Sequence, residues 1–454
     1  MASTQTHPRI APRPGLGFLL TAGRELRRDP LGNFLRLSYK FGDVVRYRGL
    51  WTTFQITHPE HIIHVLHTNA ANYRKGRDYR ILRLSLGEGL LTSEGAVWQR
   101  QRKMTQPAFH SRQVGLFVRL MEKHASALLQ EWESRAAKSE TFDVVPDLTR
   151  LTLNITSHAL FTASLESDLD TIQDALVVGR DFSVNRAWSV LRIPPWLPIA
   201  SNRRHASSLA GFHGVIDRMI AQRRESPDGV QDLLAMFMDA RDDKGEPMSD
   251  RQLRDEVATL LTAGHETTTL ALAWTIFLLS TRPEIVERIA DEIRFLQGRA
   301  PEYEELSRLQ YTRMVVEESM RIYPPVWVLS RNVVADDVIG GYKISAGAEL
   351  LIFPYVTHRH PRWWEHPEKF RPERFLPENS MGRPRGAYLP FGAGPRTCIG
   401  LNFAMTEILV VLAMFLQRFR PELAVEPSRI KPEPSVTLRP NPGVPVRLRR
   451  ISGS

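Results

Sequence analysis

FGAGPRTCIG, residues 391–400, is the stretch that decides the fold of this chain. It holds the only cysteine in the sequence, Cys398, just before an amphipathic helix that is predicted to begin at Leu401. The start of a helix favours a thiolate, because backbone N–H groups and the helix dipole stabilise negative charge there. Glycines at 392, 394 and 400 let the backbone and a large ligand approach closely. An isolated cysteine is most often a buried structural thiol, but this setting favours a ligand-binding thiolate.

The spacing in this stretch resembles the haem-binding loop of the cytochrome P-450 family, Phe-x-x-Gly-x-Arg-x-Cys-x-Gly. Its fixed positions are met by Phe391, Gly394, Arg396, Cys398 and Gly400. The resemblance implies haem b (iron protoporphyrin IX), with Cys398 as the axial ligand of the iron and Phe391 and Gly392 beside the porphyrin. In this family the thiolate pushes electron density towards the iron and favours O–O cleavage.

A long central helix is predicted upstream of this loop. Ser249 and Gln252 form a capping box, and the next helix breaker is Pro283. The helix would span residues 249–281, about 50 Å. Residues 270–279 are apolar nearly all round, which places them in the protein interior.

The middle of this helix reads AGHETT, residues 263–268, a poor helix-forming sequence because glycine costs about 1 kcal/mol relative to alanine. It is similar to the oxygen-activation motif of the P-450 family. The resemblance implies that Ala263 and Gly264 approach the haem, and that Glu266 and Thr267 are catalytic. An acid and a hydroxyl at these positions relay protons to dioxygen. Thr267 can also bond back to the carbonyl of Ala263 and loosen the helix.

Two further motifs resemble the structural support of the haem in this family. Glu318-Ser-Met-Arg321 matches the Glu-x-x-Arg helix, and PERF at 372–375 matches the loop that adds a second arginine. The resemblance implies a structural triad of Glu318, Arg321 and Arg374 that takes no part in catalysis.

Four cofactor-binding residues are expected at the haem propionates, by similarity to the family. Trp98 and Arg102 share one face of a helix at spacing i, i+4. Arg331 and Arg396 complete the set, because the arginine fork pairs well with carboxylates.

The resemblance also implies a substrate pocket lined by the loop at 77–96, the segment at about 177–201 and the turn at 326–329. Its side chains are largely apolar, so the substrate is hydrophobic. The sequence around 86–95 looks most like branches that act on fatty acids and terpenoids. The expected pocket residues are Leu86, Leu90, Phe182, Ala263, Thr267, Val326, Trp327 and Val328.

Composition and element pattern favour one large domain. The chain has 454 residues, 42% of them hydrophobic, and strand patterns cluster near its two ends. We therefore expect a mainly α fold with a minor β region (α+β), which the resemblance identifies as a cytochrome P-450 fold with haem between the central helix and the Cys-loop helix. The domain would span 1–454, with an extended lead-in at 1–30. The expected strands are Asp43–Arg48, Thr52–Thr57, Tyr342–Ile344, Glu349–Phe353 and Val444–Leu448.

The net charge and the cysteine content limit the binding partners and the cellular compartment that we expect for this chain. The net charge of +10 comes from scattered residues, which does not favour nucleic-acid binding. One cysteine excludes an internal disulfide and favours the cytoplasm. No signal peptide is evident, and no apolar run reaches the ~20 residues of a membrane span.

No Gly-rich nucleotide-binding loop is evident, so NAD(P)H electrons are expected from a separate ferredoxin- or flavodoxin-type donor. A basic cluster of Arg100, Arg102, Lys103 and Arg112 would attract such an acidic partner. We expect the enzyme to be a monomer.

Two alternatives remain beside the monooxygenase. One is a peroxide-using haem-thiolate peroxygenase or isomerase, which needs no proton relay. The other is a non-catalytic haem sensor or binding protein, which has no use for an acid–alcohol pair. The presence of both Glu266 and Thr267 favours the monooxygenase.

Overall fold

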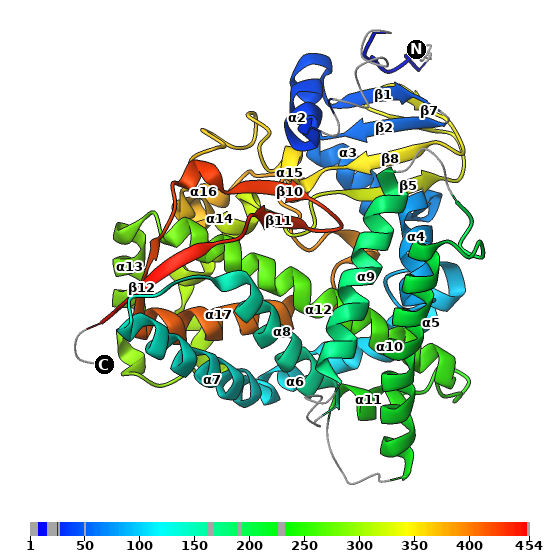
Figure 1. The fold of residues 1–454 in the computed structure, drawn as a ribbon. Coiled ribbons are helices and arrows are strands. Elements are labelled where there is room, and N and C mark those ends of the chain that lie inside the picture. Colours follow the sequence, from blue (N-terminus) through cyan, green and yellow to red (C-terminus); the bar gives the residue numbers. More distant parts are fainter. Residues whose placement is uncertain are drawn as a thin grey trace. The chain divides into compact units, whose positions relative to one another are not determined.

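The computed structural model describes residues 8–15, 25, 28–49, 51–161, 168–188, 193–225 and 232–451 (Figure 1). The chain forms two compact units. Unit 1 comprises Met1–Tyr79 and Met320–Cys398, and unit 2 comprises Arg80–Ser319 and Ile399–Ser454. The single domain expected from the sequence therefore contains two centres of packing. Because each unit uses two separated segments, neither is one continuous stretch of sequence.

The centre of unit 1 is a five-stranded sheet with the order β1-β2-β8-β5-β3 (Figure 1). β2 and β8 are parallel, with Thr53 opposite Glu349, and the other neighbouring strands are antiparallel. Buried apolar side chains such as Phe54 and Leu350 form the core of this unit. The strands of unit 1 are β1 (Val44–Arg48), β2 (Thr52–Ile56), β3 (Tyr73–Lys75), β5 (Leu329–Val333), β6 (Asp337–Ile339), β7 (Tyr342–Ile344) and β8 (Glu349–Ile352), and its helices are α2 (Pro30–Phe41), α3 (Pro59–Ile63), α15 (Pro354–Thr357) and α16 (Pro377–Ser380).

A buried polar link joins the end of α14 (Gln310–Ile322) to the loop after α15. Arg321 Nη1 donates to the backbone oxygen of His358 at 2.9 Å, and His358 Nδ1 donates to the backbone oxygen of Arg321 at 3.2 Å. His358 Nε2 accepts a hydrogen bond from Leu389 N–H at 2.8 Å. Burial, with the nearby Arg321 charge, lowers the pKa of His358 to about 3. The imidazole is therefore neutral in the folded protein.

This link makes the protein sensitive to acid. The folded pKa of His358 lies below the value of about 6.5 in an unfolded chain, so its contribution to stability is complete above pH 6.5. Below that pH the free energy of unfolding falls by about 1.4 kcal/mol per pH unit from this group alone. His358→Gln keeps an acceptor and a donor but does not titrate. Urea unfolding between pH 7 and pH 5 is therefore expected to show a flatter pH dependence for the variant. Equal slopes for the two proteins would contradict this assignment.

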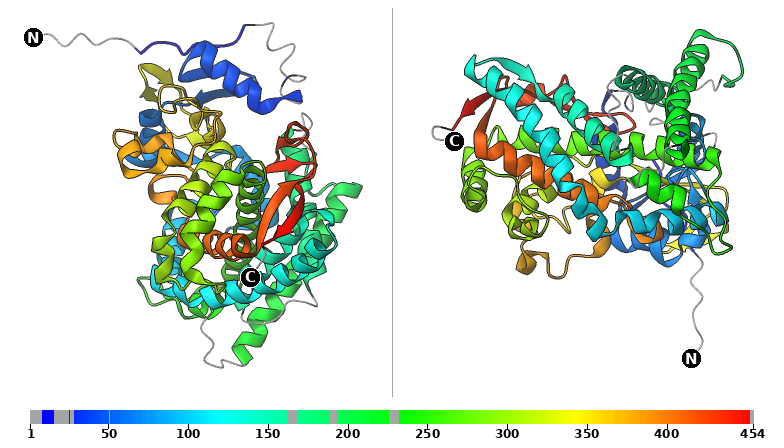
Figure 2. Two further views of the ribbon diagram at one scale, coloured as in Figure 1. Left: turned by 90° about the vertical axis from the view of Figure 1, so that its left-hand side faces the viewer. Right: turned by 90° about the horizontal axis from the view of Figure 1, so that it is seen from below.

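Unit 2 is built around the long helix α12 (Asp250–Leu279), against which α8, α10 and α17 pack (Figure 2). Every residue from Leu270 to Leu279 is buried, as the apolar run predicts. By length and composition, α17 is also able to cross a membrane, but most of it is buried within the protein. Two helices, α4 (Arg77–Leu86) and α14, each begin in one unit and end in the other. The other helices of unit 2 are α5 (Gly95–Thr105), α6 (Ser111–Leu116), α7 (Val118–Ala137), α8 (Val144–Phe161), α9 (Leu169–Trp188), α10 (Ala200–Glu225), α11 (Leu233–Asp239), α13 (Pro283–Ile293) and α17 (Leu401–Arg418).

The N-terminus of α12 forms only half of the predicted capping box. Ser249 Oγ accepts a hydrogen bond from Gln252 N–H at 3.3 Å. The Gln252 side chain instead accepts from Arg100 Nη1 at 2.7 Å. The Gln252 side chain thus bonds to an arginine distant in the sequence instead of to the backbone N–H of Ser249, as a complete capping box requires.

Unit 2 also carries a three-stranded sheet, β4-β12-β9, and a hairpin of β10 and β11. Trp274 of α12 donates to the carbonyl of Leu438 at 2.9 Å and so anchors the hairpin to the central helix. The five expected strands are present to within one or two residues at each end. The sequence did not reveal β3, β4, β5, β6, β9 or the hairpin. The strands of unit 2 are β4 (Thr141–Asp143), β9 (Phe419–Leu423), β10 (Lys431–Pro434), β11 (Leu438–Asn441) and β12 (Pro445–Arg450).

Candidate active site

The Cys398 loop of unit 1 is closed by backbone hydrogen bonds. Cys398 N–H donates to the carbonyl of Phe391 at 2.9 Å, and Thr397 N–H donates to the carbonyl of Gly394 at 3.0 Å. Gly394 has φ +72°, and a Cβ there would lie 1.8 Å from the Leu66 carbonyl oxygen. Only glycine fits this position. The loop leaves the Cys398 side chain exposed, as a metal-ligating thiol requires.

Two of the predicted propionate partners lie together in unit 1. Arg331 of β5 is buried (6% exposed) and donates to the carbonyl of Ser330 at 2.8 Å. Burial raises the pKa of the Tyr79 phenol, and the charges of Arg331 and Arg396 both oppose that rise. Both guanidinium groups therefore lie close to Tyr79. No carboxylate in the described part of the chain forms an ion pair with Arg331.

This environment fits a haem. A buried guanidinium without an acidic partner is costly, and a ligand carboxylate would neutralise it with good geometry. In unit 2, Trp98 and Arg102 lie on one face of α5, and both are half-buried. Each of the four residues carries N–H donors that suit a carboxylate, and the sequence alone did not reveal Tyr79 beside the two arginines of unit 1.

Two members of the predicted triad converge in unit 1. Arg321 and Arg374 are both buried, and each lies within hydrogen-bonding distance of the Lys369 carbonyl, at 3.3 and 3.5 Å. Arg374 also donates to the carbonyl of His366 at 2.9 Å. Glu318, one turn before Arg321 on α14, is fully buried. Their arrangement fits structural support, as the resemblance implies.

The AGHETT segment contributes to an accessible face of α12. Leu260, Ala263, Gly264 and Thr267 are only half-buried, at spacing i, i+3, i+4 and i+7. Thr267 Oγ1 donates to the carbonyl of Ala263 at 2.8 Å, which confirms the predicted bond. The expected loosening does not break the helix, because α12 continues unbroken to Leu279. Small side chains on this face leave room for a flat cofactor and its substrates.

Glu266 points into a different environment from Thr267. Its carboxylate forms an ion pair with Arg439 of β11, and both line a cavity of about 500 Å³ in unit 2. Consecutive helical residues point about 100° apart, so Glu266 reaches this cavity while Thr267 lies on the accessible face. The acid of the expected acid–alcohol pair is thus bound to a third side chain, that of Arg439. No signal in the sequence links that arginine to Glu266.

Some of the predicted pocket residues line a cavity or are half-buried, and others are packed against aromatic side chains. Leu86 lines the same cavity in unit 2, whereas Phe182 is stacked on His205 with ring centroids 3.8 Å apart. In unit 1, Trp327 is 6% exposed and packs against Phe353, with centroids 5.9 Å apart. Val326 and Val328, on either side of Trp327, are half-buried, as is Leu90 of unit 2. Phe182 and Trp327 therefore contribute mainly to packing.

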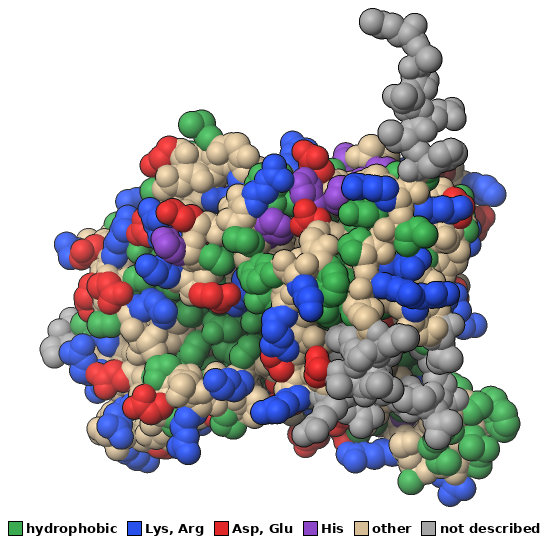
Figure 3. Space-filling model, turned by 90° about the horizontal axis from the view of Figure 1, so that it is seen from above, with side chains coloured by type: hydrophobic (Ala, Val, Ile, Leu, Met, Phe, Trp, Pro, Cys, Tyr) green, Lys and Arg blue, Asp and Glu red, His purple; other side chains and the backbone are tan. Residues whose placement is uncertain are grey.

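Histidines have structural roles in this protein. Some histidine side chains lie close together on the face that Figure 3 shows. In unit 1, His360 pairs with Asp43 at 2.9 Å and His64 pairs with Asp337 at 2.8 Å. Among the residues that the structure describes, no group of three His, Cys, Asp or Glu side chains is arranged to hold a metal ion.

The family of this chain follows from comparison with known proteins. The family model described as Cytochrome P450 matches residues 8–446. The chain belongs to the cytochrome P450 family. Its fold class is thereby confirmed, and the cofactor and co-substrate of the family are haem and O2. The protein is a cytochrome P450 monooxygenase.

Individual relatives cover nearly the whole P450 chain. Cyclooctatin synthase of Streptomyces melanosporofaciens is 36% identical over 434 residues, covering 94% of this chain and 93% of that protein. Cyclooctat-9-en-7-ol 5-monooxygenase of the same organism is 34% identical over 429 residues, covering 94% and 90%. The crystal structure of the cytochrome P450DA heme domain superposes with a TM-score of 0.86 at 28% identity, covering 98% of this chain and 99% of that chain.

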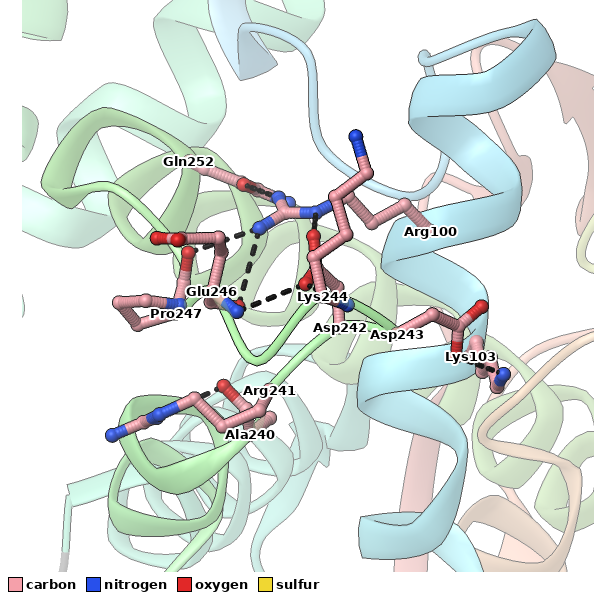
Figure 4. Close-up of polar contacts among 10 residues, drawn as sticks. All are labelled: Arg100, Lys103, Ala240, Arg241, Asp242, Asp243, Lys244, Glu246, Pro247 and Gln252. Carbon is pink, nitrogen blue, oxygen red and sulfur yellow. Dashed lines mark hydrogen bonds and ion pairs between the residues drawn. The ribbon is translucent and has the colours of Figure 1, made fainter.

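The basic cluster of this P450 is partly neutralised within unit 2 (Figure 4). Arg100 Nε donates to Asp242 at 2.7 Å, and Lys103 forms an ion pair with Asp243. This hydrogen bond from Arg100 is the main reason that the pKa of Asp242 is lowered to about 2. Arg100 and Lys103 therefore each have an acidic partner within unit 2, which partly balances their positive charge. Arg112 is exposed.

Arg100 and Lys103 provide a matched pair for a stability test. Arg100 also donates to the Gln252 side chain and to the Pro247 carbonyl, at 2.7 and 3.0 Å (Figure 4). Arg100→Met is expected to lower the free energy of unfolding by about 1–2 kcal/mol, because several acceptors lose their donor. Lys103→Met should change it by less than about 0.5 kcal/mol, because that ion pair is exposed to solvent. Urea unfolding measures both, and equal losses would contradict a structural role specific to Arg100.

Proposed function

We propose that this P450 inserts one oxygen atom of O2 into a cyclic, largely hydrocarbon substrate of the terpenoid type. The observation that carries the proposal is the accessible face of α12, which the half-buried residues Leu260, Ala263, Gly264 and Thr267 form. Small and apolar residues there accommodate a bulky apolar molecule, and Thr267 is the polar member of that face. The names of both Streptomyces relatives refer to cyclooctatin or a cyclooctatene alcohol, which favours a terpenoid over a fatty acid.

Cys398 would hold the haem iron through its thiolate, and the loop in which Phe391 and Gly392 lie would position it. Arg331, Arg396, Trp98 and Arg102 are the proposed donors to the haem propionates. When bound, haem supplies the iron at which O2 is reduced.

Thr267 and Glu266 are the proposed catalytic residues of the chain. The Thr267 hydroxyl, oriented by its bond to the Ala263 carbonyl, holds and passes a proton on the accessible face of α12. Glu266 supplies protons from the cavity in unit 2, with Arg439 fixing its side chain. The two groups therefore act from different faces of the helix.

The electrons are proposed to come from NAD(P)H through a separate ferredoxin- or flavodoxin-type protein in the cytoplasm, with the P450 acting as a monomer. Arg112, which is exposed, is the first candidate for charge contact with such a donor, because Arg100 and Lys103 each pair with an aspartate in unit 2.

Substrate titration of the purified ferric protein tests the proposed class. A cyclic diterpene alcohol is expected to shift the haem spectrum to high spin, whereas a linear fatty acid of matched carbon number leaves it low spin. A shift with the fatty acid alone would overturn the terpenoid assignment. Product formed with peroxide at the same rate as with O2 and reductant would favour the peroxygenase alternative.

A further inference from the structure

We infer that Asp255 and Glu256 of α12 are positioning residues for the substrate, because they hold the loop of residues 87–91 against the helix. We call this segment the rim loop. It joins α4 to α5 and carries Leu90, and Leu86 immediately precedes it. The inference rests on the proposed function, since it concerns access of an apolar substrate.

Two hydrogen bonds make the attachment. Asp255 Oδ2 accepts from Glu88 N–H, and Glu256 Oε2 accepts from Leu90 N–H, both at 2.9 Å. Asp255 is 4% exposed and Glu256 is 1% exposed. Alternate backbone amides of the rim loop are therefore each held by one of two adjacent buried carboxyl groups.

The glycines of the rim loop are required by this contact. Gly87 has φ +63°, and a Cβ there would lie 2.3 Å from the Asp255 carboxyl carbon. A Cβ on Gly89 would lie 2.1 Å from Thr259 Oγ1 and 2.5 Å from the Asp255 carbonyl oxygen. Backbone and helix are thus in direct contact, and any side chain at 87 or 89 would force the loop away from α12.

The loop is also held from its other side. Thr92 Oγ1 donates to the Gly87 carbonyl at 2.6 Å, and Gln101 Nε2 donates to the Glu88 carbonyl at 2.8 Å. These bonds fix the ends of the turn, whereas the two carboxyl groups fix the distance between the rim loop and α12. That distance determines the positions of the Leu86 and Leu90 side chains.

Burying the carboxyl group of Glu256 lowers the stability of the folded protein. Burial raises its pKa to about 8, so it is a neutral acid near neutral pH. Its Oε1 atom is buried, and no residue in the described part of the chain bonds to it. An unsatisfied buried polar atom costs stability. A buried acid kept at this cost, next to a second buried acid that bonds the same loop, points to a need for a defined loop position.

The experiment compares two iron ligands of different size on the full-length haem protein. Imidazole needs only access to the iron, whereas 4-phenylimidazole also needs an ordered apolar pocket. Glu256→Leu removes the acceptor at similar volume, and Glu256→Gln retains an amide oxygen for Leu90 N–H. Glu256→Leu is expected to weaken 4-phenylimidazole about tenfold or more while leaving imidazole within about twofold, a loss typical of one buried hydrogen bond. Glu256→Gln should stay within about threefold of the wild type for both ligands.

The outcomes separate this inference from the proposed function. Wild-type affinity for 4-phenylimidazole in Glu256→Leu would overturn the inference, as would equal losses for both ligands or failure of Glu256→Gln to restore binding. A wild-type protein without any imidazole-induced spectral change would instead overturn the haem-thiolate assignment. Hydrogen exchange of the wild-type peptide covering 87–93 is a second measurement that needs no variant. Protection of the Glu88 and Leu90 amides by about 100-fold or more is expected, and exchange at the rate of an open loop would overturn the inference.

Discussion

Cys398→Ser is expected to abolish the strongly red-shifted carbon monoxide band of the reduced protein, together with all monooxygenase activity. The serine hydroxyl is not ionised at neutral pH and is a poor substitute for a thiolate, so the strong electron donation that favours O–O cleavage is lost. The loop itself should remain folded, because its closure depends on the backbone bond from Cys398 N–H to the Phe391 carbonyl. The absorption spectrum and product analysis measure the two effects.

A neighbouring position gives the matched control. Thr397 Oγ1 donates to the Gly394 carbonyl at 2.8 Å, and Thr397→Ser retains that donor. This variant is expected to keep the red-shifted band and most of the activity. If Cys398→Ser kept the wild-type carbonyl spectrum, the assignment of the ligand would be wrong.

Thr267→Ala is expected to leave haem binding and reductant consumption intact while diverting electrons from product to hydrogen peroxide. Two electrons and two protons added to O2 without insertion into the substrate give H2O2. Loss of a positioned proton donor typically costs about 100-fold or more in the assisted step, so the product formed per reductant consumed should fall at least about tenfold. Measurements of NAD(P)H consumption, peroxide and product in one reaction give this ratio.

Thr268→Ala is the control for this change, because it removes a similar backbone contact from the same helix. Thr268 Oγ1 donates to the Gly264 carbonyl at 2.9 Å, but the side chain is buried at 2% exposure, away from the accessible face. Its coupling should stay near the wild-type value, and Thr267→Ser should recover most of the product. Full coupling in Thr267→Ala would show that another group supplies the proton.

The separation of Glu266 from Thr267 changes the interpretation of the acid–alcohol pair. Sequence adjacency suggested two groups that act side by side, but in the structure the acid pairs with Arg439 at a cavity that Thr267 does not line. The acid therefore has a charged partner of its own, while the alcohol lies with Ala263 and Gly264. Adjacent residues on a helix lie on different faces, so adjacency alone did not predict this division.

Local patterns in the sequence determined much of this protein. The cap at Ser249, the apolar run to Leu279 and the glycines of the Cys398 loop are local signals, because they depend on backbone geometry and on neighbours within a few residues. They predicted α12 to within about two residues, the Thr267–Ala263 bond and the family. The short strand β3 was not predicted, because it is stabilised by the pairing of Tyr73 with Val333, which lies far along the chain.

Only the tertiary structure decided which charged groups are available. Arg439 meets Glu266 across 173 positions, and Arg100 meets Asp242 across 142. The rim loop meets the buried acids of α12 across more than 160 positions. Such pairs depend on how the helices and hairpins pack, and no local pattern encodes the partner of a long polar side chain. The sequence thus determined the chemistry of the site, and packing decided which of its charges are held, buried or left accessible.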